Sequence, residues 1–521
     1  MLSRMTSIPK GSAAALLLLA LAGCGGGSGP ENSVTVIPPP GGQTFNYTDP
    51  NAYTGSPNAS LSTPNENTSV TQGSVTVGGQ AIAYTATAGH LTARHLGTDA
   101  ADASMFYVAY TANGRDPATR PVTFFYNGGP GSATVWLHMG SYGPKRLDVQ
   151  APSQDIPTPF ALVENAESML DVSDLVFVDA VGAGYSQAIS PNRNQTFYGV
   201  DADAGVFRNF IRRYVTVNGR TASPKFLFGE SYGTTRSAVL VRALETAGVR
   251  MSGVVLLSSV LNYNTNCGLG FTVQISCVGY FPSYGAIGAW HQKTNPAVPV
   301  AGLPVFAQQL RDLANNVYQP AVTTYIASHA VPDPATLQTF TNATGIPVAE
   351  WQANLNVPPD TYRIRLLPGF VLGRYDARMS VFGASPNIDI SNTFISTSFD
   401  VGLRGYLTDT LRFTTPSIYT FSSPAINTWD FSHDGNSLPD VVPDLLAALT
   451  LNPRLQVLAV SGYHDLATPW FQTERDIARL GGHPNVRVRN YPGGHMIYLD
   501  NASRIAQKAD LAEFYRTATQ P

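Results

Sequence analysis

The sequence predicts an α/β fold built on a mostly parallel, doubly wound sheet. Apolar runs of strand length alternate with segments of helical periodicity in residues 122–260 and again in residues 455–521. Such alternation is typical of parallel strands joined by helices that cover both faces of a sheet. Polar or glycine-rich segments directly follow several of these runs. Because ligands of such sheets bind at the carboxyl ends of the strands, we expect the functional residues at that edge.

Each predicted element rests on a local pattern. Runs rich in β-branched and aromatic residues predict strands over 122–126, 175–178, 226–228, 254–257, 455–460 and 486–491. Helical periodicity predicts helices over 234–247 and 471–480. A further helix, capped by Asp201 or Asp203, is predicted to carry Val206, Phe207, Phe210 and Ile211 on one face. Ahead of the sheet, short runs broken by glycine predict antiparallel hairpins from about residue 74.

Residues 1–24 form a predicted lipoprotein signal peptide. Arg4 and Lys10 flank the start of an apolar run over residues 13–21 that is too short to span a bilayer, and Leu-Ala-Gly precedes Cys24. This ending resembles the lipobox of bacterial lipoproteins, so we expect export, acylation of Cys24 and stable anchoring in a membrane of the bacterial cell envelope. Gly25 favours the outer membrane, with the protein in the periplasm. The alternative is a plain secretory signal.

Composition divides the remaining chain into three parts. Residues 25–68 are rich in Gly, Ser, Pro, Asn and Thr and predict a flexible tether. Residues 69–260 and 440–521 carry the alternating pattern and form the two parts of the predicted core. Residues 261–439 lose that pattern, which predicts a largely helical insertion that acts as a lid. A separate domain unrelated to the site is the alternative.

Bulk composition narrows the possible partners. The 521 residues carry a net charge of −3, so there is no cationic field to attract nucleic acid. No spacing of His, Cys and acidic residues indicates a metal, and we expect no cofactor. Cys267 and Cys277 predict a disulfide in an oxidising compartment, with two separate buried thiols as the alternative. The oligomeric state is left open.

Ser231 is the predicted nucleophile. An apolar run leads into Gly229-Glu230-Ser231-Tyr232-Gly233, the pattern G-x-S-x-G, which is followed by a helical segment. In this pattern a strained strand-to-helix turn exposes the serine, and the glycines leave room for the turn. The motif also recurs by chance, so an ordinary turn is the alternative until other residues support it.

A serine hydroxyl needs a base to take its proton and an acid to orient that base. Asp465 follows the strand predicted over 455–460, and His495 follows the strand predicted over 486–491. The order Ser, Asp, His is that of α/β-hydrolases. His464 is adjacent to Asp465 and would point elsewhere, and His433 lies in the insertion. We therefore predict that Ser231, Asp465 and His495 form a catalytic triad.

The loop after the strand predicted over 122–126 supplies part of a predicted oxyanion hole. Residues 127–132 read Asn-Gly-Gly-Pro-Gly-Ser. An oxyanion hole takes one backbone N–H from the residue after the nucleophile and one from an earlier strand-helix loop. These donors are predicted to be Tyr232 and Gly129. A tight turn is the alternative, but it does not account for Asn127.

Together these motifs resemble the serine carboxypeptidase family of α/β-hydrolases. The family's N-G-G-P-G, G-E-S-Y-G and G-H-M signatures are matched at residues 127–131, 229–233 and 494–496, and residues 165–186 resemble its intervening block. The resemblance extends from about residue 74 to the C-terminal end and is weakest across the insertion. It implies an α/β-hydrolase fold and a serine-type carboxypeptidase that removes C-terminal residues of peptides through an acyl-enzyme on Ser231.

In that family, an Asn and a Glu hold the free carboxylate of the peptide, and the matching residues here are Asn127 and Glu230. An acidic side chain favours the binding of an anionic substrate only when the side chain is protonated and donates a hydrogen bond. The family's E-L-G-P segment begins here with Ser141, so one acid of the network is replaced. A serine esterase, an acyltransferase or another serine peptidase is therefore the alternative, and a non-catalytic binding lipoprotein is a more distant one.

Overall fold

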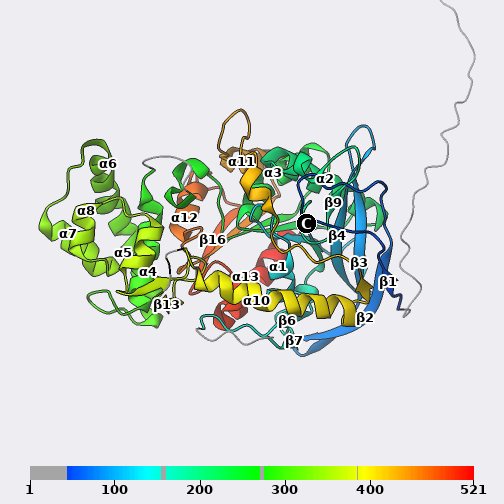
Figure 1. The fold of residues 1–521 in the computed structure, drawn as a ribbon, viewed down its shortest axis with the longest axis horizontal. Coiled ribbons are helices and arrows are strands. Elements are labelled where there is room, and N and C mark those ends of the chain that lie inside the picture. The colour runs from blue at the N-terminus through cyan, green and yellow to red at the C-terminus, as the bar shows by residue number, and fades with distance from the viewer. Residues whose placement is uncertain (1–43, 154–159, 270–274, 384, 386, 521) are drawn as a thin grey trace, which may run out of the picture.

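The computed structural model describes residues 44–153, 160–269, 275–383, 385 and 387–520. They form an elongated molecule with a twisted sheet toward one end and a group of helices at the other (Figure 1). The predicted α/β fold is confirmed. Residues 1–43, which include Cys24 and the first part of the predicted tether, lie outside the described residues. None of the helices in the described ranges has the length and apolar character that a bilayer crossing requires.

The central sheet has 10 strands, with the spatial order β16-β15-β11-β10-β5-β8-β4-β3-β2 and β9 paired to β4. The strands from β16 to β8 run parallel, and the others are antiparallel. The parallel strands are β5 (Val122–Tyr126), β8 (Asp174–Val178), β10 (Lys225–Glu230), β11 (Gly253–Leu257), β15 (Gln456–Gly462) and β16 (Val486–Tyr491). The antiparallel strands are β2 (Thr68–Val77), β3 (Gln80–Arg94), β4 (Ala101–Ala112) and β9 (Gln187–Ala188). Because β10 lies between β5 and β11, the loops that follow these three strands meet at one edge.

Helices cover both faces of this sheet. Successive strand residues point to opposite faces, so Phe125 joins one apolar core while Phe124 joins the other. The first core is closed by α1 (Val135–Gly140), α10 (Ile390–Gly405) and α13 (Asn501–Ala518). The second core is closed by α2 (Val200–Val217), α3 (Tyr232–Thr246) and α11 (Val442–Leu451). α12 (Trp470–Ala478) joins the sheet to the helical group.

The start of α2 differs from the prediction. Its N-cap is Gly199, and no side chain accepts a capping hydrogen bond. Asp201 and Asp203 lie inside the first turn, where negative charge still interacts favourably with the helix dipole. Neither caps the helix, because Asp203 is buried in an ion pair with Arg236 and Asp201 bonds to His433.

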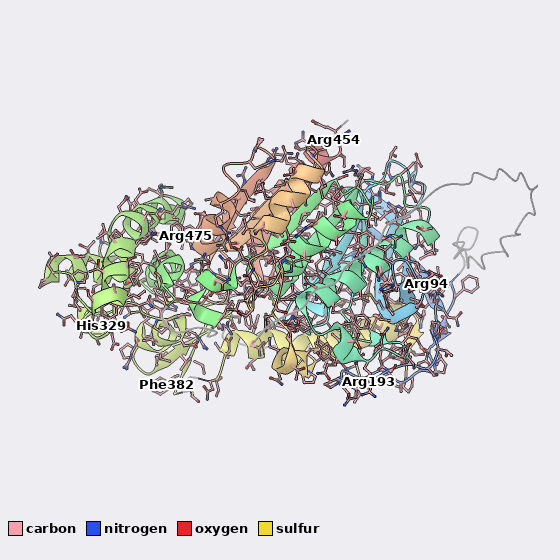
Figure 2. All side chains as sticks on the ribbon, turned by 90° about the horizontal axis from the view of Figure 1, so that it is seen from above. Arg94, Arg193, His329, Phe382, Arg454 and Arg475 are labelled. Atoms are coloured by element: carbon pink, nitrogen blue, oxygen red, sulfur yellow. A yellow bond between two sulfur atoms is a disulfide. The ribbon has the colours of Figure 1, made fainter. Side chains whose placement is uncertain are left out.

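The first half of the predicted insertion forms the group of helices at the far end of the molecule. Phe281, Tyr318, Phe340 and Trp351 pack there around an apolar core of their own. The helices are α4 (Phe281–Trp290), α5 (Leu303–Leu313), η7 (Ala314–Tyr318), α6 (Gln319–Ser328), α7 (Pro334–Thr344), α8 (Val348–Ala353) and α9 (Pro359–Arg365). Figure 2 shows His329 and Phe382 at this end and Arg94 and Arg193 at the opposite end.

The second half of the insertion packs against the main domain instead. A hairpin of β12 (Phe370–Leu372) and β13 (Ser380–Phe382) leads into α10, whose apolar face belongs to the first core of the sheet. After it, β14 (Phe413–Thr414) pairs with β1 (Tyr47–Thr48). The predicted insertion, residues 261–439, therefore divides into two parts. Its first half belongs to the helical group, and its second half belongs to the main domain because the apolar face of α10 is buried in the first core.

The prediction of a flexible tether through residue 68 is wrong from residue 44 onward. β1 pairs with β14, and Tyr53 and Leu61 are buried. The buried Asp49 carboxylate lies 3.2 Å from His90 Nδ1 and accepts a 2.8 Å hydrogen bond from the Tyr53 hydroxyl. A few well-spaced aromatic and apolar residues fix this segment, although its overall composition is polar.

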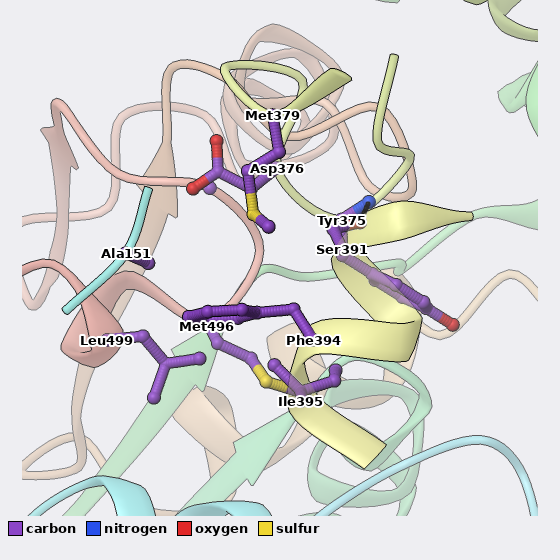
Figure 3. Close-up of a pocket in the computed structure, with 10 residues that line it drawn as sticks. Ala151, Tyr375, Asp376, Met379, Ser391, Phe394, Ile395, Met496 and Leu499 are labelled. Carbon is purple, nitrogen blue, oxygen red and sulfur yellow. Dashed lines mark hydrogen bonds between the residues drawn. The ribbon is translucent and has the colours of Figure 1, made fainter. Parts of the chain in front are cut away.

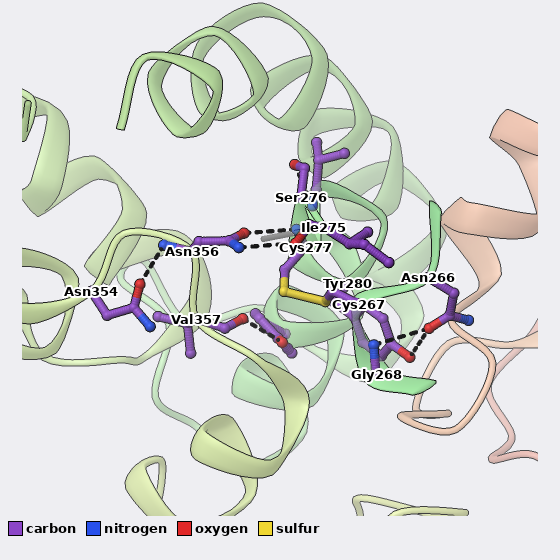
Figure 4. The surroundings of a disulfide bond; sticks show 12 residues. Asn266, Cys267, Gly268, Ile275, Ser276, Cys277, Tyr280, Asn354, Asn356 and Val357 are labelled. Atoms are coloured by element: carbon purple, nitrogen blue, oxygen red, sulfur yellow. Dashed lines mark hydrogen bonds between the residues drawn. A yellow bond between two sulfur atoms is a disulfide. The ribbon is translucent and has the colours of Figure 1, made fainter. Parts of the chain in front are cut away.

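Two further features complete the fold. β6 (Lys145–Leu147) pairs with β7 (Leu162–Glu164) near the first core. Cys267 and Cys277 form a disulfide at the start of the insertion (Figure 4). Asn356 holds the second half of this loop, since its Oδ1 accepts from the Cys277 N–H at 2.7 Å and its Nδ2 donates to the Ile275 carbonyl at 2.9 Å.

Candidate active site

Ser231 lies on a sharp turn between β10 and α3. Its backbone has φ of 59° and ψ of −128°, a conformation that costs a non-glycine residue about 1–3 kcal/mol. The Ser231 N–H donates to the Leu257 carbonyl at 2.9 Å, which ties the turn to β11. A Cβ on Gly229 would lie 2.2 Å from the Gly233 carbonyl oxygen, so the close approach of strand and helix requires glycine. This turn presents Ser231 at the carboxyl edge of the sheet, as the sequence predicted.

His495 and Asp465 form a buried pair beside this turn. His495 Nδ1 lies 2.7 Å from Asp465 Oδ2. Asp465 Oδ1 also accepts from the N–H groups of Ala467 and Thr468 at 2.7 and 3.1 Å, and the Thr468 hydroxyl donates to Oδ2 at 2.8 Å. These donors fix the carboxylate, and the carboxylate in turn fixes the imidazole through Nδ1, which leaves Nε2 without a hydrogen bond to any residue that the structure describes.

Backbone contacts bring His495 to the serine turn. The Ser258 hydroxyl donates to the His495 carbonyl at 2.6 Å, and Ser258 directly follows Leu257, which holds Ser231. On the other side, the His495 N–H donates to the Tyr375 carbonyl at 2.6 Å, and the two rings lie 5.1 Å apart. The structure therefore gathers the predicted triad residues at one edge of the sheet, where Ser231 follows β10 and His495 follows β16.

The pKa of His495 is shifted in the direction that favours a general base. Burial opposes protonation of the imidazole, but the Asp465 carboxylate outweighs that effect and raises the pKa of His495 above its ordinary value. A more basic imidazole accepts a proton from a serine hydroxyl more readily, and the imidazolium that forms is stabilised by Asp465.

The predicted oxyanion loop lies directly over the serine turn. A Cβ on Gly128 would come within 2.5 Å of the Tyr232 nitrogen, so only glycine allows the loop to lie this close. Gly129 follows with φ of 106°. Since Tyr232 is the first residue of α3, its N–H has no partner within the helix. The two predicted oxyanion donors, Gly129 and Tyr232, thus lie on segments that are in close contact beside Ser231.

A buried arginine that the sequence did not reveal holds this loop in place. Arg236 lies on α3 and forms a two-point ion pair with Asp203, at 2.6 Å from Nε and 3.2 Å from Nη2. Its Nη1 donates to the Asn127 carbonyl at 2.8 Å. One side chain thereby links α2, α3 and the loop that begins at Asn127.

We expect Arg236→Met to destabilise the fold by about 3–5 kcal/mol, because it leaves the Asp203 carboxylate buried without a partner. The free energy of unfolding from urea titration measures this loss. Arg479→Met is the matched control, since Arg479 is half-exposed in its pair with Asp440 and should cost about 1 kcal/mol or less. An equal loss in both variants would contradict the role of burial.

A second cluster next to Ser231 contains Glu230, Asn127 and Tyr498. The Tyr498 hydroxyl donates to Glu230 Oε2 at 2.7 Å, and the Asn127 side chain is close enough to both groups to act on their pKa values in the lowering direction. Asn127 Oδ1 accepts from the Leu137 N–H at 3.0 Å, so the amide nitrogen is the donor that its side chain can offer. Burial raises the pKa of Glu230 to about 7, so the carboxyl group carries a proton in weakly acidic solution.

Ser141 does not join this cluster through its hydroxyl. Its Oγ donates to the Leu137 carbonyl at 2.5 Å, and its carbonyl accepts from Asn165. Tyr498, which the sequence reasoning missed, is the additional hydrogen-bonding partner of Glu230. The only available signal was its position shortly after Gly494-His495-Met496.

The other two histidines that the sequence brought into question lie in different surroundings from His495. His433 lies between Asp201 and Asp444, at 2.6 Å from Nδ1 and 2.9 Å from Nε2. Hydrogen bonding to Asp444 raises the pKa of His433 to about 9, so it serves as a cation that links α2 to α11. His464 is buried next to Trp290, and burial lowers its pKa well below the ordinary value. Neither imidazole can act as the base for Ser231.

A small apolar cavity of about 20 Å³ lies beside the histidine loop. Figure 3 shows that Phe394 and Ile395 of α10 face Met496 and Leu499 across it. It has room for no more than a water-sized group. α10 therefore forms part of the wall behind His495, which places the second half of the insertion at the site.

Comparisons with known proteins match the central part of the chain. Residues 79–263 match the family model described as serine carboxypeptidase. This segment is similar to serine carboxypeptidases. Serine carboxypeptidase-like 16 of Arabidopsis thaliana is 25% identical over 182 residues, which are 33% of this chain and 40% of that protein. The chain is thus aligned with less than half the length of this relative.

The likeness in three dimensions extends further than the match in sequence. The prohormone-processing carboxypeptidase Kex1Δp of Saccharomyces cerevisiae superimposes with a TM-score of 0.54 at 16% identity, over 83% of this chain and 91% of that one. This supports a common fold. The segment matched to the serine carboxypeptidase family contains Asn127, Gly129, Glu230 and Ser231, whereas Asp465 and His495 lie beyond it.

Proposed function

We propose that this protein is a serine-type carboxypeptidase that acts on peptide substrates. The observation that carries the proposal is the buried cluster of Asn127, Glu230 and Tyr498 beside Ser231. A protonated carboxyl group and an amide at this position offer hydrogen-bond donors to an anion, and the C-terminal carboxylate of a peptide is an anion next to the last peptide bond. An ester or an internal peptide bond presents no such group.

In the acylation step, Ser231 Oγ attacks the carbonyl carbon of the last peptide bond while His495 Nε2 takes the hydroxyl proton. The oxyanion that forms accepts hydrogen bonds from the N–H groups of Gly129 and Tyr232, each worth about 3 kcal/mol in comparable sites. The C–N bond then breaks, and His495 returns the proton to the leaving amine. The C-terminal amino acid departs, and the rest of the peptide remains as an ester on Ser231.

In the deacylation step, a water molecule takes the place of the leaving amine. His495 accepts a proton from it, hydroxide attacks the ester carbonyl, and the same two N–H groups bind the second oxyanion. Collapse of this intermediate breaks the bond to Ser231 Oγ, which regains its proton from His495. Asp465 holds the imidazole in one orientation throughout both steps.

The direct test is mass spectrometry of a peptide offered in three forms: with both ends free, with an acetylated N-terminus and with an amidated C-terminus. We expect the first two to lose residues one at a time from the C-terminus and the amidated form to be cut far more slowly. Cleavage inside all three forms would instead indicate an endopeptidase.

The second candidate function is that of a serine esterase or acyltransferase. It is favoured by one observation: a serine stands at position 141, and its hydroxyl bonds to the last turn of α1, so the Glu230 cluster contains a single acid. Turnover of a short-chain acyl ester, together with no shortening of any of the three peptides, would support this candidate. Addition of an amino acid or an alcohol as acceptor would then separate transfer from hydrolysis.

We further propose that the protein is exported and anchored in the bacterial envelope through an acylated Cys24, facing the periplasm. The lipobox-like Leu-Ala-Gly-Cys ending supports this. We expect Cys24→Ser to abolish incorporation of labelled palmitate and to release the protein from the membrane fraction. Cys267→Ser is the control that should keep the label. Continued labelling of the Cys24→Ser protein would contradict the assignment.

A further inference from the structure

Arg374 is a positively charged residue of the insertion that lies against the triad. Its N–H donates to Asp389 Oδ1 at 3.0 Å, at the start of α10. Its carbonyl accepts at 3.0 Å from the N–H of Leu466, the residue after Asp465. The next residue, Tyr375, accepts from the His495 N–H. The backbone of Arg374 is therefore fixed between the acid and the base of the triad.

The guanidinium group of Arg374 has no partner among the described residues. No hydrogen bond or ion pair of the described chain reaches its nitrogen atoms, although most of the side chain is buried. Neighbouring arginines of the insertion differ in this respect. Arg378 is paired with Asp376 and Asp500, Arg363 donates to the Leu372 carbonyl, and Arg311 is paired with Glu474.

The acidic groups that face Arg374 are engaged elsewhere. Asp389 accepts from backbone N–H groups and from the Ser391 hydroxyl at the start of α10, and Asp360 is paired with Arg363. A guanidinium always carries its charge. Burial opposes the charge of Arg374, but the nearby Tyr375, Tyr280, Asp360 and Asp389 outweigh burial and raise its pKa. An incoming carboxylate would gain paired hydrogen bonds to the nitrogen atoms that no described residue engages.

Arg374 is close enough to His495 for its charge to act on the imidazole. Its positive charge lowers the pKa of His495, in opposition to the larger effect of Asp465. Figure 3 shows the hydroxyl of Tyr375 turned away from the apolar cavity that Met496 and Leu499 line. The segment of Arg374 and Tyr375 thus contacts both the Asp465 loop and the histidine loop through its backbone.

We propose that Arg374 binds an acidic side chain of the substrate next to the bond that is cleaved. The proposal rests on the proposed function, since it assigns a preference for Asp or Glu to the same site. Two substrate positions could supply this carboxylate, the C-terminal residue that leaves and the residue before it. The terminal α-carboxylate is not the ligand, because the proposed function assigns that group to the Glu230 cluster.

The test compares matched peptides that carry Glu or Gln at the C-terminal position in one pair and at the preceding position in another. Binding is measured by calorimetry in a Ser231→Ala protein, so that no turnover is needed. We expect the Glu peptide of one pair to bind about 10- to 100-fold more tightly than its Gln counterpart, as for a charge-assisted pair of hydrogen bonds. The pair that responds identifies the position.

Arg374→Gln in the same background should reduce that ratio to about one. Arg365→Gln is the control, since Arg365 lies in the same insertion but is half-exposed and paired with Glu350, and it should keep the ratio. A ratio near one for both pairs before Arg374 is changed, or a ratio that survives Arg374→Gln, would overturn the proposal. If active protein fails to shorten any peptide while the Glu preference persists in binding, the proposed function fails and the subsite stands.

Discussion

Replacement of Ser231 by alanine is expected to abolish hydrolysis, with a loss of about 10⁴- to 10⁶-fold in kcat. The reason is that His495 and the oxyanion donors have no nucleophile to activate once the hydroxyl is removed. Covalent labelling by a fluorophosphonate probe should disappear as well, because the probe reacts with an activated serine. The fold should persist, since the turn at Ser231 is held by its backbone N–H to Leu257 and by the glycines around it.

The measurement requires a control that removes a serine hydroxyl elsewhere. Ser328→Ala suits this purpose because Ser328 is exposed at the end of α6, where its hydroxyl bonds to the Thr324 carbonyl. We expect this variant to be labelled at the rate of the unchanged protein. Labelling of Ser231→Ala at that same rate would show that another residue is the nucleophile, and circular dichroism would confirm that both variants are folded.

Most of the sheet and the reactive residues could be predicted from sequence because their signals are local. The strands β5 and β10 are short apolar runs, and each leads into a glycine-rich motif whose backbone geometry admits few residue types. The candidate triad residues could be predicted because each of them follows a strand of a parallel sheet. Such features depend on neighbouring residues and on strand direction rather than on long-range packing.

What escaped prediction depends on contacts between distant segments. Arg236 is an ordinary helical arginine in the sequence, and its role appears once α2 brings Asp203 to it. Little in the sequence distinguishes Tyr498 from the other tyrosines, and its role appears once the fold brings it to Glu230. The segment from residue 44 was predicted to be a tether because its composition is polar. In the structure Asp49 binds both Tyr53 and the distant His90, and these contacts hold the segment in place.

The proposed reaction requires opposite protonation states of Glu230 and His495. Cleavage of a free-acid peptide requires Glu230 to be protonated, as a donor to the carboxylate, while His495 must be neutral to act as a base. The pKa of Glu230 is raised by burial to about 7, and that of His495 is raised by Asp465, so the two groups titrate as a coupled pair. A single pH profile would therefore mix both groups, and a ratio of two substrates is needed to separate them.

The ratio of kcat/KM for a free-acid peptide to that for its amide is expected to be highest in acid and to fall about tenfold per pH unit above about 7. The sign follows from Glu230: below its pKa the carboxyl group donates to the substrate carboxylate, and above it two negative charges repel each other. Deprotonation of His495 affects both substrates equally and cancels in the ratio.

In Glu230→Gln the ratio should become independent of pH, because an amide donates a hydrogen bond at every pH and can still accept from Tyr498. Glu513→Gln is the control, since Glu513 is exposed on α13 and its change should leave the pH dependence intact. A ratio that is flat with pH in the unchanged protein would show that Glu230 does not bind the terminal carboxylate. A ratio that still falls with pH in Glu230→Gln would assign the titration to another group, and the esterase candidate would then gain support over the carboxypeptidase.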